Sequence, residues 1–339
     1  MPLYGGLDLH GDNVYLALMD AAFNRVFERR LPNDLTVILN ALEPYRERLA
    51  GLVVESTYNW YWLVDGLQAQ RYPAKLANPA RMQENIGLKN ASDRTDAFFL
   101  AKQDAMGVLP QGYVYPKEER PVRDLMRRRM RLSRVRTAEW LSLESLVARH
   151  SGKSLGIQAL SHLKEGELST LLGGERLVVG AAQISYRHIA FLDQEIALME
   201  KSVEARVKLL PEYERLMTVP GIGRILTMAI MLETGPIKRF AGPGNYASYC
   251  RAVKAEHTSN ERKKGSGNRK SGNKYLSWAY VEAATYAVRY SPELRKWYQR
   301  KEARTKRVVA IKALANKLAK ACFFILRDGV AFDVKKLVG

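Results

Sequence analysis

Four carboxylates near the start of the chain have the residue types and surroundings of a divalent-metal site: Asp8, Glu55, Asp93 and Asp96. Asp8 and Glu55 each stand within or directly after an apolar run. Because burying a lone charge is costly, each needs a partner or a metal. Converging carboxylates repel one another unless a cation neutralises them, and hard oxygen ligands suit Mg²⁺ or Mn²⁺. Two such ions, roughly 3.5–4 Å apart, would clamp the attacking and leaving oxygens of a phosphoryl transfer.

A structural role is the alternative for part of this set. Asp93 and Asp96 are three residues apart on an expected helix, so their carboxylates share one face. Taken alone, such acids are commonly first-turn residues that the helix dipole favours. Asp8 and Glu55 have no comparable explanation, and the four together favour a metal site.

The apolar pattern predicts the sheet that would position these acids. Three strands joined by short turns come first, followed by a helix capped by Asn33 or Asp34 and by a fourth strand that ends at Glu55. A right-handed crossover lays the fourth strand parallel to the first, with the hairpin strands on the other side. Glu55 then lies beside Asp8, where open α/β sheets place their sites. The predicted strands are 3–9, 14–19, 23–31 and 51–55, with the helix at 35–42 between the last two; a helix at 58–68, a short strand at 71–76 and a helix opened by Ser92 follow.

Composition favours a polyanionic partner. The 339 residues carry 54 Lys plus Arg against 35 Asp plus Glu, a formal net charge of +19. At 339 residues and 47% hydrophobic, the chain can build more than one core, and two or three domains are expected. The two distant cysteines and an N-terminus without a charged-then-apolar leader predict a cytoplasmic protein without disulfides. No apolar stretch has membrane-spanning length, and no zinc spacing occurs.

Glycines and prolines between 107 and 116 mark the first domain boundary, before a long basic helix at about 121–150. No acid lies between Leu125 and Thr137 to balance its arginines, which favours phosphate contact over a merely solvated face. A second long helix, 183–210, would pair with the first as an antiparallel hairpin or form a dimer interface. The arginines expected to bind nucleic acid are Arg127, Arg128, Arg131 and Arg134.

The segment 219–223, Val-Pro-Gly-Ile-Gly, is typical of a helix-hairpin-helix turn. Gly221 and Gly223 would let backbone N–H groups at a helix start approach a phosphate without reading sequence. A plain connector between helices 212–217 and 224–233 is the alternative.

A polar loop is expected at 254–274, between the preceding helices and those at 275–290 and 292–326. Its cations could close over nucleic acid. Its serines offer hydroxyl nucleophiles, although composition alone indicates ordinary loop residues. The cations are Arg262, Lys263, Lys264, Arg269, Lys270 and Lys274.

Five motifs occur in an order that resembles one known family. They are Gly6-Leu7-Asp8-Leu9-His10, Val54-Glu55-Ser56-Thr57, Asp93-Arg94-Thr95-Asp96-Ala97 with Leu100-Ala101, Val219-Pro220-Gly221-Ile222-Gly223, and a Gly-Ser-Lys loop before Tyr275-Leu276. Together they resemble the DEDD transposases of the insertion sequence 110 family, including its 1111-type branch and the Piv-type invertases. The resemblance spans residue 3 to about residue 325.

The resemblance implies a RuvC-like, ribonuclease-H-like α/β domain over 1–108, a coiled-coil connector over 109–210 and an all-α transposase domain over 211–339. It also implies a recombinase guided by a structured bridge RNA that pairs with donor and target DNA. Asp8, Glu55, Asp93 and Asp96 would hold Mg²⁺ or Mn²⁺. Ser259, in Thr258-Ser259-Asn260, matches the family's nucleophile, although that segment departs from the family's Ser-Ser-Gly pattern.

The same resemblance implies a nucleoid-associated dimer that assembles to a tetramer, the metal domain of one subunit meeting the serine domain of another. Two other functions fit the residues. A hydrolytic Holliday-junction-type endonuclease would use water in place of Ser259, and a non-catalytic nucleic-acid-binding protein would keep the fold as a scaffold. Neither the proton acceptor for the serine nor the choice between insertion and inversion follows from the sequence.

Overall fold

The structure, a computed structural model, describes residues 1–82, 92–253, 256–259, 262–266 and 271–338. The chain divides into two compact units. Met1–Lys117 with His257–Ser271 form the first, and Glu118–Glu256 with Gly272–Gly339 form the second. Among the described residues, no helix combines the length and apolar character that crossing a membrane requires.

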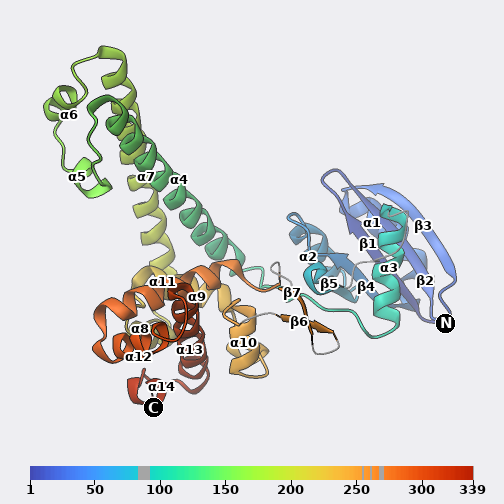
Figure 1. Ribbon diagram of the computed structural model, residues 1–339. Coiled ribbons are helices and arrows are strands. Elements are labelled where there is room, and N and C mark those ends of the chain that lie inside the picture. Colours follow the sequence, from blue (N-terminus) through green and yellow to red (C-terminus); the bar gives the residue numbers. More distant parts are fainter. Residues whose placement is uncertain (83–91, 254–255, 260–261, 267–270, 339) are drawn as a thin grey trace. The chain divides into compact units, whose positions relative to one another are not determined.

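A mixed five-stranded sheet of order β3-β2-β1-β4-β5 forms the centre of the first unit (Figure 1). β1 pairs antiparallel with β2 and parallel with β4. The predicted hairpin and crossover are therefore confirmed. The elements are β1 (Leu3–Leu9), β2 (Asn13–Asp20), β3 (Arg25–Pro32), α1 (Leu35–Leu42), the 3₁₀ helix Glu43–Arg48, β4 (Leu49–Glu55), α2 (Tyr61–Ala69), β5 (Ala74–Ala77), the 3₁₀ helix Pro79–Arg81 and α3 (Asp93–Ala105).

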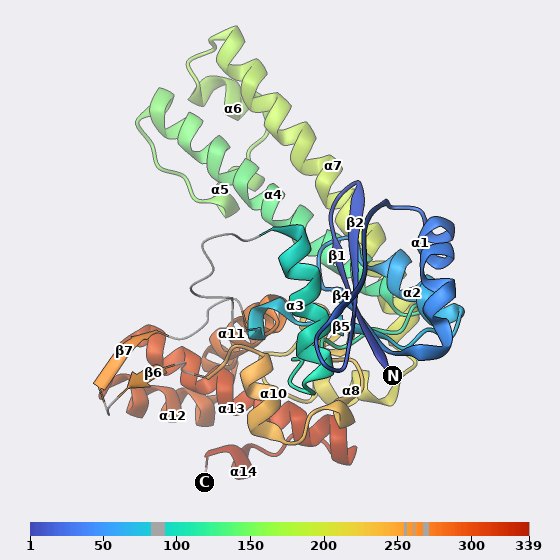
Figure 2. The ribbon, with the colours of Figure 1, turned by 90° about the vertical axis from the view of Figure 1, so that its right-hand side faces the viewer.

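The two faces of the sheet are covered by different helices. α1 and α2 cover one face and α3 covers the other (Figure 2). Alternation along each strand decides which residues meet which helix. On β1, Leu7 and Leu9 enter the core beneath α1 and α2. On β4, Val54 enters that same core, whereas Val53 packs against Leu100 of α3 on the other face. The α3 face therefore receives the odd-numbered positions of β4 and the even-numbered positions of β1.

Gly6 lets α3 approach the sheet closely. A Cβ built at Gly6 would lie 1.9 Å from the carbonyl oxygen of Ala97 on α3. No side chain fits in that space, so backbone and helix meet directly. Ala97 and Ala101 are fully buried at this contact because their small side chains permit it.

The second unit begins with a pair of 32-residue helices, α4 (Arg120–Ser151) and α7 (Arg176–Val207). They run antiparallel, since Trp140 packs edge-on against Tyr186 whereas Arg129 pairs with Glu200. α5 (Ile157–Ser161) and α6 (Glu165–Leu171) connect them. The predicted antiparallel pairing of the two long helices is confirmed (Figure 1).

Shorter helices form the rest of the second unit around a core built on α11 and α13. They are α8 (Pro211–Met217), α9 (Arg224–Thr234), the 3₁₀ helix Ile237–Arg239, α10 (Pro243–Tyr249), α11 (Lys274–Tyr290), α12 (Pro292–Glu302), α13 (Arg307–Asp328) and α14 (Val334–Val338).

Two expectations about this part of the chain are wrong. The stretch 292–326 is not one helix: α12 ends before Ala303, and extended Lys306 starts α13. This break lets α12 fold back and pack on α13. The segment 254–274 is not only a loop, because β6 (Glu256–Ser259) and β7 (Arg262–Ser266) pair as a two-stranded sheet. Backbone hydrogen bonds define these strands, and the polar sequence gives no apolar alternation that would predict them.

Candidate functional site

β1 and β4 place Asp8 and Glu55 side by side. Leu7 pairs with Val54, so Asp8 and Glu55 are the next residues along these parallel strands. Asp8 shares its face with Gly6, and Glu55 shares its face with Val53, which is the face that α3 covers. Asp8 is 5% exposed. Both carboxylates therefore project toward α3 at the carboxyl ends of a parallel pair.

Ser92 fixes the start of α3 and with it the two remaining acids. Its hydroxyl accepts a hydrogen bond from the Thr95 N–H, and its own N–H donates to the Thr95 hydroxyl at 2.8 Å. This capping box starts the helix directly before Asp93. Asp93 and Asp96 lie in the first turn, where the helix dipole favours negative charge.

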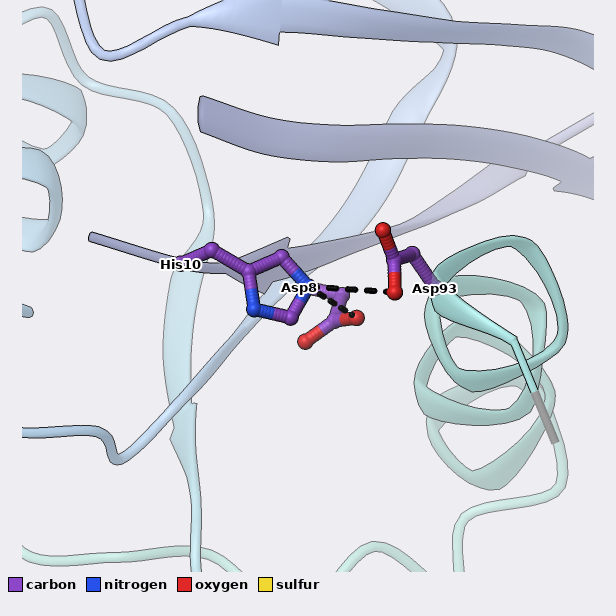
Figure 3. Close-up of side chains that lie close together, drawn as sticks. All are labelled: Asp8, His10 and Asp93. Carbon is purple, nitrogen blue, oxygen red and sulfur yellow. Dashed lines mark ion pairs between the residues drawn. The ribbon is translucent and has the colours of Figure 1, made fainter. Parts of the chain in front are cut away.

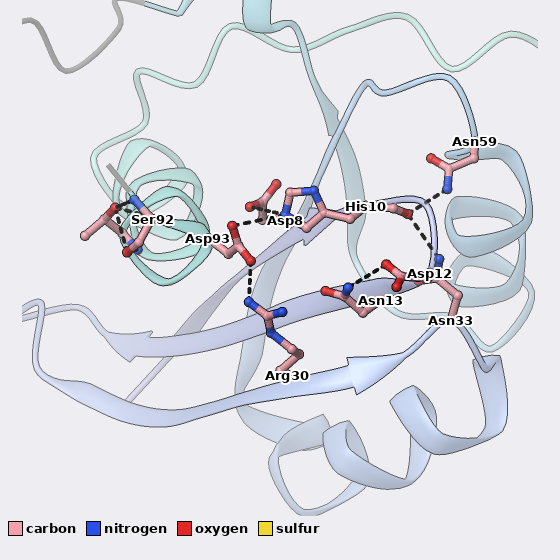
Figure 4. Close-up of polar contacts among 10 residues, drawn as sticks. Asp8, His10, Asp12, Asn13, Arg30, Asn33, Asn59, Ser92 and Asp93 are labelled. Carbon is pink, nitrogen blue, oxygen red and sulfur yellow. Dashed lines mark hydrogen bonds and ion pairs between the residues drawn. The ribbon is translucent and has the colours of Figure 1, made fainter. Parts of the chain in front are cut away.

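A histidine lies between two of these carboxylates. His10 Nε2 is 3.1 Å from Asp8 Oδ2 and 3.3 Å from Asp93 Oδ1 (Figure 3). Two side-chain amides anchor the His10 carbonyl: Asn59 donates to it at 2.9 Å and Asn33 at 3.1 Å (Figure 4). The backbone at His10 is therefore held in place, and the ring nitrogen lies between the two carboxylates.

Arg30 supplies a second cationic contact. Its guanidinium donates to Asp93 Oδ2 at 2.6 Å. Register explains the position, because Asp8 pairs with Tyr15 and Tyr15 pairs with Arg30, which places the three residues in one row across the sheet.

The electrostatics show a surplus of negative charge. Burial raises the pKa of Asp8, and the charges of Asp96 and Asp93 raise it further while His10 opposes them. Burial also raises the pKa of Glu55, with Asp8 as the next cause. The pKa of Asp96 rises through burial and through the charge of Asp93. Each shift means that the acids favour neutralisation, by a proton or by a cation.

The donor set fits a hard divalent cation. Asp8, His10 and Asp93 each offer one ligand atom, and these atoms all lie within 4.8 Å of one another. Glu55 and Asp96 are not in this group of three, but their pKa values respond to Asp8 and Asp93 respectively. Carboxylate oxygens suit hard cations such as Mg²⁺ or Mn²⁺, whereas an imidazole nitrogen is more typical of transition metals.

Sequence reasoning assigned no role to His10 or to Arg30. A signal existed for His10, which stands two residues after Asp8 and so on the same side of an extended chain. Arg30 could be found only from the register of three strands.

The arginines of α4 are more often paired than the sequence indicated. Arg127 forms a bidentate ion pair with buried Glu233, at 2.5 and 2.7 Å. Arg129 pairs with Glu200, and Arg136 pairs with Asp193. The acids that pair with these three arginines lie outside the stretch 125–137, on α7 and α9. The ion pair between Arg127 and Glu233 thus links α4 to α9. Arg128, Arg131 and Arg134 are exposed, and phosphate contact by them stays a prediction.

The turn at 219–223 joins α8 to α9 as predicted. Gly221 has φ +86°, and a Cβ built there would lie 2.3 Å from the carbonyl oxygen of Ala283 on α11. Glycine is therefore required by both conformation and packing. Gly223 is the N-cap of α9 and supplies no side-chain hydrogen bond. Phosphate contact by either glycine stays a prediction.

The predicted nucleophile, Ser259, is the last residue of β6. Arg262, Lys263 and Lys264 belong to β7, whereas Arg269 and Lys270 lie outside the described residues. Lys274 begins α11, and its Nζ lies 5.2 Å from the Tyr275 ring centroid. The roles assigned to these residues stay predictions.

A match to a known protein family covers part of the second unit. Residues 213–299, from α8 into α12, match the sequence model of the Transposase IS116/IS110/IS902 family. The resemblance to the insertion sequence 110 family is confirmed. The matched segment contains both the 219–223 turn and Ser259.

Three relatives are named as transposases. A probable family 20 transposase of Pseudomonas aeruginosa is 26% identical over 67% of this chain and 68% of its own length. The transposase for insertion sequence element IS1111A of Coxiella burnetii is 23% identical over 68% and 63%. The transposase for IS1328 of Yersinia enterocolitica is 25% identical over 44% and 46%.

Proposed function

We propose that this chain is a transposase that cuts and rejoins DNA strands with the help of a divalent metal. The observation that carries the proposal is the convergence of Asp8, Glu55 and the first turn of α3 on one face of the sheet. The relatives named as transposases support the same activity. A RuvC-like fold for the first unit is part of the proposal, since the strand order and the position of the acids agree with it.

Asp8, Glu55, Asp93 and Asp96 hold Mg²⁺ or Mn²⁺ in this proposal. The bound ion would neutralise charge on the phosphoryl oxygens and lower the pKa of the attacking hydroxyl. His10 lies close enough to Asp8 and Asp93 to share the ion with them. Arg30 screens the repulsion between Asp93 and the other acids.

Ser259 supplies the nucleophile. Its oxygen bonds to a DNA phosphorus while the bond from phosphorus to one sugar oxygen breaks, and that oxygen leaves with a proton. The resulting phosphoserine diester conserves the energy of the broken link, so a second sugar hydroxyl can reverse the step and rejoin strands. No nucleotide cofactor is needed for this exchange.

A structured bridge RNA selects donor and target DNA by base pairing in this proposal. The net charge of +19 supports nucleic-acid partners. The exposed Arg128, Arg131 and Arg134, together with the cations of β7, would contact phosphates without reading sequence.

A second copy of the chain covers the outer face of α7. Large apolar side chains recur there at every seventh position and are between 56% and 82% exposed. The opposite side of α7 packs on α4, so these side chains remain exposed to solvent within the described part of one chain. Heptad spacing of exposed apolar residues is typical of helix–helix association. The stripe consists of Leu177, Ile184, Phe191 and Leu198.

One experiment tests the catalytic proposal. Protein, Mg²⁺, element-derived RNA and labelled donor and target DNA are incubated, and protein–DNA adducts are sought under denaturing conditions. We expect an adduct with the wild type and none with Asp8→Ala or Ser259→Ala. Ser145→Ala, which removes an exposed hydroxyl of α4, is the matched control and should retain the adduct.

Cleavage without an adduct, unchanged by Ser259→Ala, would instead identify a hydrolytic nuclease. Binding without cleavage, equal for wild type and Asp8→Ala, would identify a non-catalytic binding protein.

A further inference from the structure

A large groove in the second unit lies outside the metal site. It has a volume of about 1080 Å³ and is lined by α4, by α11 and by residues 217–226. These last residues comprise the end of α8, the turn at 219–223 and the start of α9. This volume is slightly above the roughly 300–1,000 Å³ typical of ligand sites. All of its lining residues belong to one unit, so the groove is a feature of that unit alone.

Two tyrosines of α11 form an aromatic surface on the groove. Tyr286 and Tyr290 are 43% and 65% exposed, and their rings lie nearly parallel, 10° apart with centroids 6.2 Å from each other. They are four residues apart, so one helix face presents both. Trp278 also lines the groove, although it packs against the hydrophobic core as well.

Positive charge accompanies these rings. Arg134 of α4 lines the groove and is exposed, with no ion pair among the described residues. Arg224 at the start of α9 is 48% exposed at its side chain, although Glu200 and Glu204 pair with it. Glu282 is the acid that lines the groove. The first turn of α9 adds backbone N–H groups, because Gly223 leaves them without a side-chain cap.

We propose that this groove binds unpaired single-stranded DNA, with bases stacked on Tyr286 and Tyr290 and a phosphate near Arg134 and the start of α9. Flat rings beside cations are the combination that single-strand binding proteins use, since every base has a face that can stack. Bases inside a duplex cover each other's faces and cannot reach the rings.

This inference rests on the proposed function, in which a DNA strand must leave its complement before it is exchanged. That requirement makes DNA, among single-stranded nucleic acids, the expected occupant of the groove.

The test is equilibrium binding of the full chain to fluorescent oligo-dT in the absence of divalent metal. Fluorescence anisotropy measures the binding. The double variant Tyr286→Ala/Tyr290→Ala should bind about tenfold or more weakly, the scale expected when stacking residues are truncated. Tyr286→Phe/Tyr290→Phe keeps both rings and should bind as the wild type does. Phe324→Ala removes a ring of similar exposure, 40%, from α13 outside the groove, and should change nothing.

Equal binding of oligo-dT by the wild type and the double alanine variant would overturn the inference. So would loss of duplex and single-strand binding to the same extent, or a stronger effect on oligo-U than on oligo-dT, which would assign the groove to RNA. Asp8→Ala separates this inference from the catalytic proposal, because it should abolish adducts and leave oligo-dT binding unchanged.

Discussion

Replacing Gly6 with alanine should separate the carboxylates on α3 from those on the sheet, although it changes none of the four acids. The added Cβ would lie 1.9 Å from the carbonyl oxygen of Ala97, whereas contacts under 3.0 Å essentially never occur. The obstacle is helix backbone, which cannot rotate aside. α3 must therefore move away from β1 by at least about 1.1 Å, the difference between these two distances.

This displacement has two measurable consequences. Overpacking a tight contact costs about 1–3 kcal/mol, so the free energy of unfolding of the first unit should fall by that amount. Asp93 and Asp96 move with α3 while Asp8 and Glu55 stay on the sheet. A misplacement of about 1 Å can reduce a reaction rate roughly 100-fold, so strand cleavage should fall on that scale.

The assay combines urea unfolding with Mn²⁺ titration by calorimetry and with the cleavage reaction. Gly180→Ala is the matched control, because no atom lies within 4 Å of a Cβ built at that position. It should leave metal affinity and cleavage as in the wild type. If Gly6→Ala binds Mn²⁺ and cleaves like the wild type, α3 does not position the metal site, and the reasoning fails.

Three further predictions concern charge and assembly. Burial and mutual repulsion raise the pKa values of Asp8, Glu55 and Asp96, so the free energy of unfolding should fall as pH rises above their ordinary pKa values of 3.8 and 4.5. Mg²⁺ should reverse this loss, and melting temperatures measured with and without the metal would show it. Arg127→Ala leaves Glu233 short of a partner and should cost about 3 kcal/mol in urea unfolding, whereas exposed Arg128→Ala should cost less than about 0.5 kcal/mol; equal losses would contradict the ion-pair argument. Ile184→Glu/Phe191→Glu should lower the mass measured by light scattering to that of one chain, and an unchanged oligomer would place the subunit contact elsewhere.

Several features followed from the sequence because they depend on neighbouring residues. Strand alternation and the helix between β3 and β4 were enough to predict the crossover that sets Glu55 beside Asp8. Ser92 before Asp93 predicted the start of α3, since capping acts within one turn. The long helices and the turn at 219–223 carried equally local signals.

Other features exist only after distant segments pack together. The acid that neutralises Arg127 is 106 residues away on α9, so counting charges along α4 could not reveal it. Arg30 reaches Asp93 because three strands align in register, and Gly6 matters because the backbone of α3 lies against it. The local sequence thus determined the strands and the helix that carry the four acids, and where the acids stand along them. Packing decided which charges are neutralised, because pairing depends on distance in space and not on distance along the chain.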